Sequence, residues 1–407
     1  MKILMISLDK KILEHNSAVQ KRHFEYGGIC DELCIVVLGN AGAHGMEHEN
    51  TRKKIPLAPF AKGGIGGNVK IYTAGGKNKI SRFFKACVLA GEIVKKNKID
   101  LVTTQDAAYA GLIGYCLNKK FKIKLNVQIH GLEEKFLNKI LFLSLKRKII
   151  KSADSVRVVS ERMRRWVMRK YKVDNSRIFK ISVYSELELR IKNQESGIKN
   201  QQLINENIKK LEIGNCLPAE VSAQVGKLGD KFIILTVGRL VKVKNIGLQI
   251  KAVADVIKMF PNIRLVIAGD GAEKKNLEEL ASRLKLNDIV EFSGWQENLK
   301  PYYENADLFL LTSNSEGWGM AVIDAMASAV PVIMTDVGCA GEVVKNNENG
   351  IVIRKGDKNR LVAAISEIIA DKEKREVFSK KGRATVMKLP NKEETMEMYG
   401  KMWKFRN

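Results

Sequence analysis

The sequence predicts an α/β protein of two domains, each built on a parallel sheet with helices on both faces. Three observations support this prediction. The chain has 407 residues, more than one ordinary domain core contains. Apolar runs of strand length alternate with helix-length segments in both halves, which is the pattern of consecutive βαβ units. A polar stretch rich in Asn and Gln, residues 191–210, interrupts the alternation between the halves.

The composition is typical of a soluble globular protein, with 45% apolar and 28% charged residues. No run of 18 apolar residues predicts a membrane-spanning helix. The N-terminal segment MKILMISLDK reaches Asp9 too soon for a signal peptide and predicts a buried strand instead. The six cysteines include no C-x2-C pair, which argues against zinc ribbons and favours a reducing compartment. We therefore expect a cytoplasmic protein.

Positive charge is concentrated in the first half of the chain. The formal net charge is +25, and residues 1–180 hold 36 lysines and arginines against 15 acidic residues. Such asymmetry predicts an acidic partner, namely an anionic membrane face, a phosphorylated acceptor or nucleic acid. A lysine-rich solvated surface is the alternative. Nucleic acid is disfavoured, because neither zinc-finger spacing nor an RNA-binding aromatic signature accompanies the basic residues.

The first half contains strand-like apolar runs and one long helical segment. The predicted strands are residues 2–7, 34–39, 69–73, 99–104, 124–130 and 155–160. Residues 80–98 predict a helix that ends in lysines, which suits the helix dipole. Its apolar positions follow one helical stripe, formed by Phe83, Phe84, Cys87, Val88, Gly91 and Val94.

Two further predicted helices of this half are basic, residues 135–153 and 161–172. In the second of them Met163, Trp166 and Val167 form one apolar face. Core packing explains that face without any partner. Contact with a membrane surface is the alternative, because the arginines and lysines around the face match anionic lipid.

The loop between the second and third predicted strands contains two sets of residues that resemble known motifs. Gly64 and Gly66 have dinucleotide-type spacing, yet they neither follow the first strand nor open a βαβ unit. His44, Glu47 and His48 have the order of a zinc motif that requires a stable helix, whereas glycines flank them here. We expect neither a cofactor site nor a metal site.

The second half repeats the α/β pattern and predicts a second Rossmann-like domain. Its predicted strands are residues 231–238, 263–269, 288–294, 306–312, 331–336 and 350–356. Its predicted helices are residues 245–260, 275–286, 321–329 and 359–370. Ligands of such sheets bind beyond the carboxyl ends of the strands, so we expect functional residues directly after the strands.

Polar residues do follow these strands. Arg239 and Lys244 follow the first, and a guanidinium fork beside a mobile ammonium group suits a diphosphate. Asp270 follows the second strand, and Trp295 follows the third as a wall for a nucleobase. Glu316 follows the fourth strand in a glycine-flanked turn before a helix, whose free backbone N–H groups bind anions and hydroxyls.

The segments TVGRLVKVKN, VIAGDG, FSGW and ADLFLLTSNSEGWGMAVIDAMASAVPVIMTDVGCAGEVV resemble the retaining nucleotide-sugar glycosyltransferases of family 4. In the first half the likeness is looser and depends on QIHG and ADSVRVVSERM. The family has the GT-B fold of two Rossmann-like domains that face each other across a cleft. The resemblance implies an acceptor-side domain at 1–183, a linker at 184–230 and a donor domain at 231–391, with a terminal helix at 392–407 returning to the first domain.

The resemblance also assigns roles to individual residues. Arg239 and Lys244 would hold the donor diphosphate, and Glu316, the first acid of the family's E-x7-E motif, would lie at the transferred sugar. Asp324, the second acid, would bind the ribose. His130 matches the family's histidine near the reacting sugar, which makes it a catalytic candidate with Glu316, Arg239 and Lys244. The implied donor-binding positions are Arg239, Lys244, Gly269, Asp270, Gly294, Trp295, Glu316, Gly317, Trp318, Gly319, Met320 and Asp324.

The chain departs from the family pattern at three places. Asp324 replaces the usual Glu and reaches one methylene less far. The Gly-Gly loop that often follows the first strand is missing from SLDKKILEHN, and SVYSE stands in place of a P-N-G-V-D-like segment. Of the family's properties, acceptor recognition is therefore the one that the resemblance predicts least well for this chain.

The sequence thus predicts transfer of a sugar from a nucleoside-diphosphate donor, without a metal, to a glycan or lipid-linked acceptor. The basic first half predicts peripheral contact with the inner face of the membrane. A catalytically silent protein that binds nucleotide-sugars is the first alternative, suggested by the departures above. An epimerase or phosphorylase of the same fold is the second.

Overall fold

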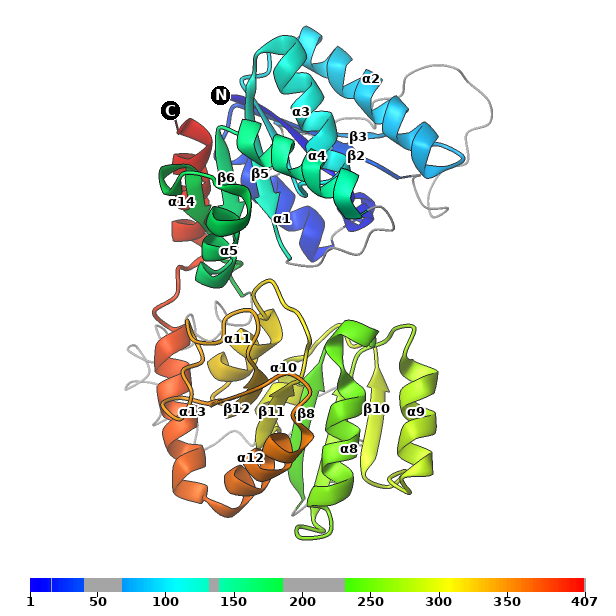
Figure 1. Ribbon diagram of the computed structural model, residues 1–407, viewed down its shortest axis with the longest axis vertical. Coiled ribbons are helices and arrows are strands. Elements are labelled where there is room, and N and C mark those ends of the chain that lie inside the picture. Colours follow the sequence, from blue (N-terminus) through cyan, green and yellow to red (C-terminus); the bar gives the residue numbers. More distant parts are fainter. Residues whose placement is uncertain (16, 40–67, 132–138, 186–230, 406–407) are drawn as a thin grey trace, which may run out of the picture. The chain divides into compact units, whose positions relative to one another are not determined.

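A computed structural model describes residues 1–15, 17–39, 68–131, 139–185 and 231–405 (Figure 1). The chain divides into two compact units, of which the first joins Met1–Ser182 to Lys392–Asn407 and the second is Val183–Asn391. The motif-like histidines and glycines of the loop after Gly39, and nearly all of the predicted linker, lie outside the described residues. Within the described ranges, no group of three His, Cys, Asp or Glu side chains is placed to hold a metal ion.

The described part of the first unit contains a sheet of seven parallel strands in the order β3-β2-β1-β4-β5-β6-β7. The strands are β1 (Lys2–Ser7), β2 (Glu32–Val37), β3 (Val69–Thr73), β4 (Leu101–Thr104), β5 (Lys124–Ile129), β6 (Ser155–Val158) and β7 (Ile178–Lys180). The chain runs from β1 outward to β3 and then returns to β4 on the other side of β1. The strand order therefore reverses between β1 and β4, as in doubly wound sheets.

Helices cover this sheet, and the C-terminal helix is one of them. They are α1 (Ala18–Gly27), α2 (Lys79–Asn97), α3 (Tyr109–Phe121), α4 (Lys139–Ser152), α5 (Glu161–Tyr171) and α14 (Lys392–Lys404). The rings of Tyr399 and Trp403 in α14 are buried and lie 4.8 and 6.0 Å from the ring of Tyr26 in α1. This aromatic cluster attaches the end of the chain to the first unit.

The described second unit contains a parallel sheet in the order β10-β9-β8-β11-β12-β13. The strands are β8 (Phe232–Val237), β9 (Ile263–Ala268), β10 (Val290–Gly294), β11 (Leu308–Leu311), β12 (Val332–Thr335) and β13 (Ile351–Ile353). The helices are α8 (Ile246–Val256), α9 (Lys274–Arg283), α10 (Lys300–Glu304), α11 (Met320–Ala327), α12 (Lys358–Ala370) and α13 (Lys372–Val386), with a 3-10 turn, η5, at Lys242–Lys244.

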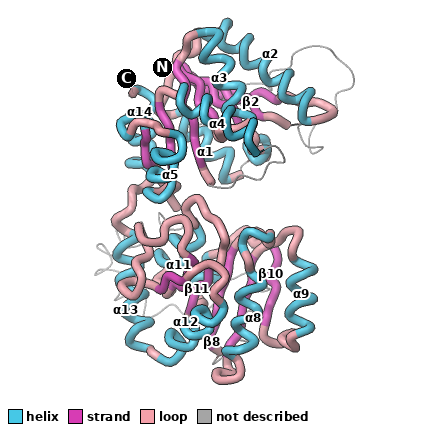
Figure 2. The backbone as a smooth tube through the Cα atoms, in the orientation of Figure 1, coloured by secondary structure: helices cyan, strands magenta, loops and turns pink. Residues whose placement is uncertain are grey.

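The strands of each unit lie among helices, which form the outer layers (Figure 2). A sheet covered on both faces buries both sides of its central strands, which explains the uninterrupted apolar runs of the sequence. Ile234, Leu265, Leu310 and Ile333 of the second unit are fully buried in this way. The prediction of two parallel-sheet α/β domains is confirmed.

The apolar stripe predicted for residues 80–98 is wrong in part. Helix α2 forms there, but it buries Ala86, Ala90, Ile93 and Val94. Of the predicted stripe only Val94 is buried, and Phe84 and Val88 are 63% and 64% exposed. The helix carries apolar residues on more than one face, so periodicity alone did not select the one that packs. Small alanines allow the closest approach to the sheet, and they take the inner face.

The apolar face predicted on residues 161–172 packs into the core. Met163 and Val167 of α5 are fully buried. Trp166 is half-buried, with its ring 5.3 Å from that of Tyr171 in an edge-to-face arrangement. The core-packing alternative therefore accounts for α5.

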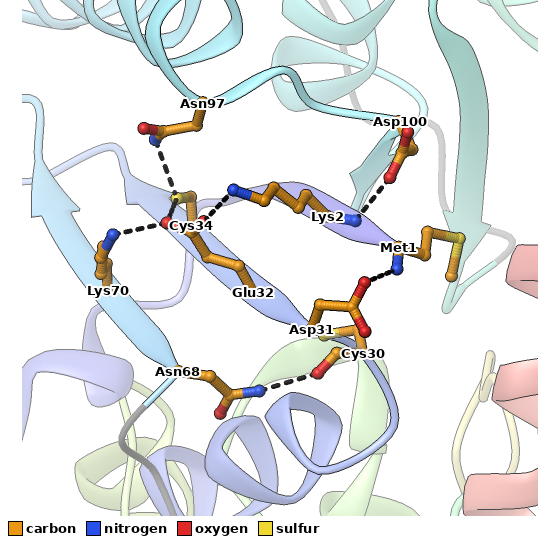
Figure 3. Close-up of polar contacts among 10 residues, drawn as sticks. All are labelled: Met1, Lys2, Cys30, Asp31, Glu32, Cys34, Asn68, Lys70, Asn97 and Asp100. Carbon is orange, nitrogen blue, oxygen red and sulfur yellow. Dashed lines mark hydrogen bonds and ion pairs between the residues drawn. The ribbon is translucent and has the colours of Figure 1, made fainter.

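The amino ends of the strands in the first unit are joined by polar contacts (Figure 3). The carboxylate of Glu32 accepts from both Lys2 and Lys70, at 3.0 and 2.5 Å. The terminal amino group of Met1 pairs with Asp31. These contacts satisfy the charged groups at this edge, which is opposite to the carboxyl edge where ligands of such sheets bind.

Candidate active site

The strand order of the second unit reverses at β8, because β9 lies on one side of it and β11 on the other. Such a switch point leaves a crevice beyond the carboxyl ends of the two central strands. Arg239 and Lys244 follow β8, and Glu316 follows β11, which pairs directly with β8. Residues about 70 positions apart in sequence therefore meet at one edge of the sheet.

Lys244 and Glu316 are in direct contact there. The Lys244 Nζ lies 2.5 Å from Glu316 Oε1, and the side chains are only 23% and 13% exposed. Ser313 Oγ donates a second hydrogen bond to the same carboxylate oxygen, at 2.7 Å. An ammonium group has three donors, so Lys244 can hold Glu316 and still bind an anionic oxygen.

The turn that carries Lys244 is fixed to the loop that carries Glu316. The backbone N–H of Asn314 donates to the carbonyl of Val243 at 2.7 Å. Thr312 Oγ1 donates to the carbonyl of Asn245 at 3.0 Å and accepts from Gln249 Nε2 at 3.0 Å. The cation and the acid are thus positioned by backbone as well as by their own contact.

Two glycines allow neighbouring loops to approach those that carry Arg239 and Glu316. A Cβ atom on Gly269 would lie 1.9 Å from the carbonyl oxygen of Gly238, at the ends of β9 and β8. A Cβ atom on Gly338 would lie 2.4 Å from the carbonyl oxygen of Trp318 and 3.0 Å from the Cβ of Glu316. Gly338 also has a φ of +54°, which favours glycine. Gly338 supports the Glu316 loop, and our sequence reasoning missed it.

The other predicted strand-end residues line the same carboxyl edge. Arg239 is exposed, and no ion pair of the described residues includes it. Asp270 is exposed as well, and its Oδ1 accepts from the N–H of Gly271 at 2.6 Å. Gly294 accepts from the N–H of Gly269 at 2.6 Å, and the following Trp295 is 67% exposed. The indole of Trp295 is thus largely open to solvent beside this edge.

The turn before α11 can bind a ligand through backbone N–H groups rather than through side chains. Gly319 caps the helix with a φ of +101° and no side-chain cap. The N–H groups of Met320 and Ala321 therefore remain available, whereas that of Val322 donates to the carbonyl of Gly319 at 2.9 Å. Gly317 precedes this turn. Trp318 is 4% exposed, so its ring belongs to the packing of the loop.

Asp324 lies on α11 and is half-buried. Its Oδ1 accepts a hydrogen bond from Ser185 Oγ, and Ser185 is 2% exposed. Burial, with the nearby Asp324 charge as a second cause, raises the pKa of Tyr303 well above its ordinary value. Ser185 belongs to the SVYSE segment that departs from the family pattern, and nothing in the sequence indicated that it contacts Asp324.

His130 belongs to the first unit and directly follows β5. Its Nδ1 lies 3.4 Å from Arg157 Nη1, a buried guanidinium in β6. Arg157 also donates to Gln128 Oε1 at 3.1 Å and, through Nε, to the carbonyl of Ile181 at 3.0 Å. A guanidinium only donates, so Nδ1 of His130 accepts and the ring proton lies on Nε2.

The same surroundings keep His130 neutral. Burial among protein atoms, followed by the positive charges of Arg157 and Arg22, lowers the pKa of His130 to about 3. The residue nevertheless has an exposed surface, so water reduces the effect of burial and the two cations give the firmer argument for the direction. A neutral imidazole with its proton on Nε2 is a hydrogen-bond donor near pH 7.

Two family models match the chain. The model described as glycosyl transferases group 1 matches residues 219–385, and the model described as glycosyltransferase family 4 matches residues 36–182. Together they include both units and every predicted site residue. The chain belongs to glycosyltransferase family 4.

Curated relatives of this family 4 protein include enzymes of lipopolysaccharide and glycolipid synthesis. The lipopolysaccharide core biosynthesis glycosyltransferase LpsE of Rhizobium meliloti is 29% identical over 177 residues, covering 44% of this chain and 51% of the relative. The alpha-monoglucosyldiacylglycerol synthase of Acholeplasma laidlawii is 31% identical over 157 residues, covering 37% of this chain and 39% of the relative. The matches thus span about half of these relatives or less.

Solved structures resemble this family 4 protein over nearly its full length. Anabaena HepE in complex with UDP has a TM-score of 0.71 at 16% identity and covers 98% of both chains. Sucrose-phosphate synthase from Thermosynechococcus elongatus has a TM-score of 0.74 at 21% identity, covering 99% of this chain and 98% of the other. These likenesses show the fold, which is GT-B.

Proposed function

We propose that this protein transfers a sugar from a nucleoside-diphosphate donor to a glycan or lipid-linked acceptor, with retention at the anomeric carbon. The observation that carries the proposal is the contact among Lys244, Glu316 and Ser313 at the switch point of the second unit. It joins a cation and a carboxylate beside a helix start whose N–H groups are available. A diphosphate and a sugar require these two kinds of partner.

In this proposal Arg239 and Lys244 stabilise the negative charge that develops on the leaving diphosphate. Glu316 accepts hydrogen bonds from sugar hydroxyls and orients the donor. The bond from the anomeric carbon to the diphosphate oxygen breaks with its electron pair on the diphosphate. The acceptor oxygen attacks from the same face, and its proton passes to the diphosphate. Asp324 binds the ribose, and Trp295 stacks on the base.

His130 acts in this scheme as a neutral donor. Its Nε2–H hydrogen-bonds to a sugar hydroxyl, and its low pKa makes it a poor general base. The first unit supplies this residue together with the acceptor side. Relatives that act on lipopolysaccharide core or diacylglycerol glycolipid support a lipid-linked acceptor at the cytoplasmic membrane face.

A donor panel tests the proposal. The protein is incubated with UDP-, GDP- and ADP-sugars, beginning with UDP-glucose because HepE has been solved with it. We expect one donor to release its nucleoside diphosphate, and the product of an α-linked donor to carry an α linkage by NMR. Release from no donor, or a β product, would contradict the proposal.

The same panel separates the alternatives. A silent binding protein gives saturable donor binding by calorimetry without release of the nucleoside diphosphate. An epimerase changes the sugar while it stays attached to the diphosphate, and a phosphorylase requires inorganic phosphate. The hydrogen bond from Ser185 to Asp324 is the observation that favours a silent binding protein. It occupies one carboxylate oxygen of Asp324, which would otherwise accept from the ribose.

A further inference from the structure

Helix α2 lies on the outside of the first unit (Figure 1). It presents an apolar stripe to solvent. Ile80, Phe84 and Val88 are 68%, 63% and 64% exposed. They are four residues apart, which places them on one face over about 12 Å of the helix axis. The opposite face supplies the core contacts through Ala86 and Ala90. Packing among the described residues of the first unit therefore leaves the stripe uncovered.

Basic residues surround this stripe. Those in and just before α2 are Lys77, Lys79, Arg82, Lys85, Lys95 and Lys96, and Glu92 is the acid of the helix. The end of α3 lies beside Gly91, beyond the stripe in the second half of α2, and extends the basic surface with Lys119, Lys120 and Lys122. In the part of the chain that the structure describes, no ion pair includes any of these lysines. Their charge is available to an external partner.

The position of the stripe suits the proposed reaction. Helix α2 follows β3, so its first turns lie near the carboxyl edge of the sheet, where His130 follows β5. Lys79 begins the helix, and the exposed residues occupy its first half. The apolar stripe therefore begins near the carboxyl edge of the first sheet, and the predicted acceptor-side histidine, His130, lies at that edge.

The combination of charge and exposed apolar side chains selects the partner. A second copy of this face would bring lysines against lysines, which opposes dimerisation. An anionic lipid surface offers phosphates to the lysines and an acyl boundary to the apolar side chains. A helix with these two features lies in the plane of the membrane interface.

We propose that the outer face of α2 docks on membranes that contain anionic lipid, with Ile80, Phe84 and Val88 inserted and the lysines of α2 and α3 on the head groups. This inference rests on the proposed function, because docking serves that function by bringing the first unit to a lipid-linked acceptor. It moves the membrane contact from α5, whose apolar face is core, to α2. No described helix is both long and apolar enough to cross a membrane, and docking requires none.

Co-sedimentation of the full chain with vesicles tests the proposal. We expect binding to vesicles of phosphatidylcholine with phosphatidylglycerol, and little to phosphatidylcholine alone. Salt at about 1 M should weaken binding at least tenfold, because it reduces the screening length to roughly 3 Å. Equal binding to both kinds of vesicle, or binding to neither, would overturn the proposal.

Matched variants locate the surface. Phe84→Ser and Val88→Ser should each lower the partition coefficient about tenfold, because each removes inserted apolar area. Lys79→Gln and Lys85→Gln should each lower it about fivefold through lost attraction to lipid phosphate. The controls are Met259→Ser and Lys372→Gln, which alter exposed residues of the second unit and should bind as the wild type does. Binding of Phe84→Ser equal to that of the controls would overturn the assignment to α2.

The readouts keep this inference separate from the proposed function. Donor turnover without vesicles tests the transferase, and Phe84→Ser should leave it unchanged. Lost vesicle binding with unchanged turnover supports the docking surface. If Phe84→Ser instead dissociates a dimer in vesicle-free solution, the stripe binds a second copy and the membrane proposal is overturned.

Discussion

The carboxyl edges of the two sheets position their candidate residues by different means. In the second unit, Lys244 and Glu316 lie on loops fixed by backbone hydrogen bonds and by closely approaching glycines. In the first unit, His130 is oriented by the buried side chain of Arg157, which reaches it from the neighbouring strand. One edge relies on loop geometry and the other on a side-chain network inside the sheet.

This difference teaches where each unit is vulnerable. A change in the second unit should act directly on donor binding or on leaving-group charge, or should displace a loop. A change in the network of the first unit should act through the ionisation of His130 and therefore through pH. Four substitutions separate these expectations.

The largest effect is expected at the Lys244–Glu316 contact. Lys244→Ala should lower kcat/KM for the donor by about 10²–10³, the usual cost of losing a preorganised charge at an active site. Lys242→Ala is the matched control, since Lys242 lies in the same turn but is exposed. Steady-state release of the nucleoside diphosphate measures both. Near-wild-type turnover in Lys244→Ala would remove this residue from the mechanism.

The loop geometry of the second unit is tested by Gly338→Ala. Its new Cβ would meet the carbonyl of Trp318 at 2.4 Å, in addition to the strain of a left-handed backbone. Gly341→Ala is the control, because Gly341 also has a positive φ but nothing within 4 Å of its Cβ position. Both should lose about 1–2 kcal/mol from backbone strain. Only Gly338→Ala should lose more, together with about tenfold in activity through Glu316.

Denaturant unfolding and donor turnover measure the two glycine variants. Equal stability and equal activity of the two would show that the approach of the loops does not position Glu316.

The network of the first unit is tested by Arg157→Met. Removing the cation should raise the pKa of His130 from about 3 toward its ordinary 6.5. The wild-type imidazole stays neutral as pH falls to 5, whereas that of the variant takes up a proton. Activity of the variant should therefore decline as pH falls toward 5, where the wild type shows no decline due to this residue. The His130 pKa of the variant should stay below its ordinary value, because burial and the charge of Arg22 still lower it.

NMR titration of the five histidines measures the His130 pKa directly, and rate profiles against pH measure its consequence. Arg157→Lys keeps a positive charge and should hold the His130 pKa nearer to the wild-type value. An unchanged pKa in Arg157→Met would reduce Arg157 to a packing role.

The smallest effect is expected at the Ser185–Asp324 contact. Ser185→Ala removes one hydrogen bond to a carboxylate, which should change KM for the donor by about fivefold, with kcat unchanged. Ser182→Ala is the control on the same segment. If kcat falls and KM does not, Asp324 acts in the chemical step and not in ribose binding.

The sequence by itself determined the two parallel-sheet domains and the strand-end residues of the second unit. Both follow from local rules. A strand covered on both faces is mostly apolar, and the chain leaves each strand at the carboxyl edge, where Arg239, Asp270 and Glu316 then lie. A short sequence window was therefore enough to nominate each residue.

Only the tertiary structure decided which side chains meet. Arg157 and His130 are 27 residues apart, and Ser185 and Asp324 are 139 apart, so no window of sequence contains either contact. The predicted stripe of α2 was wrong in part for another reason, since apolar residues occupy two of its faces. Alanines fit closely against the neighbouring elements, so Phe84 and Val88 remained outside. Packing fixed that choice, and with it the surface that we assign to the membrane.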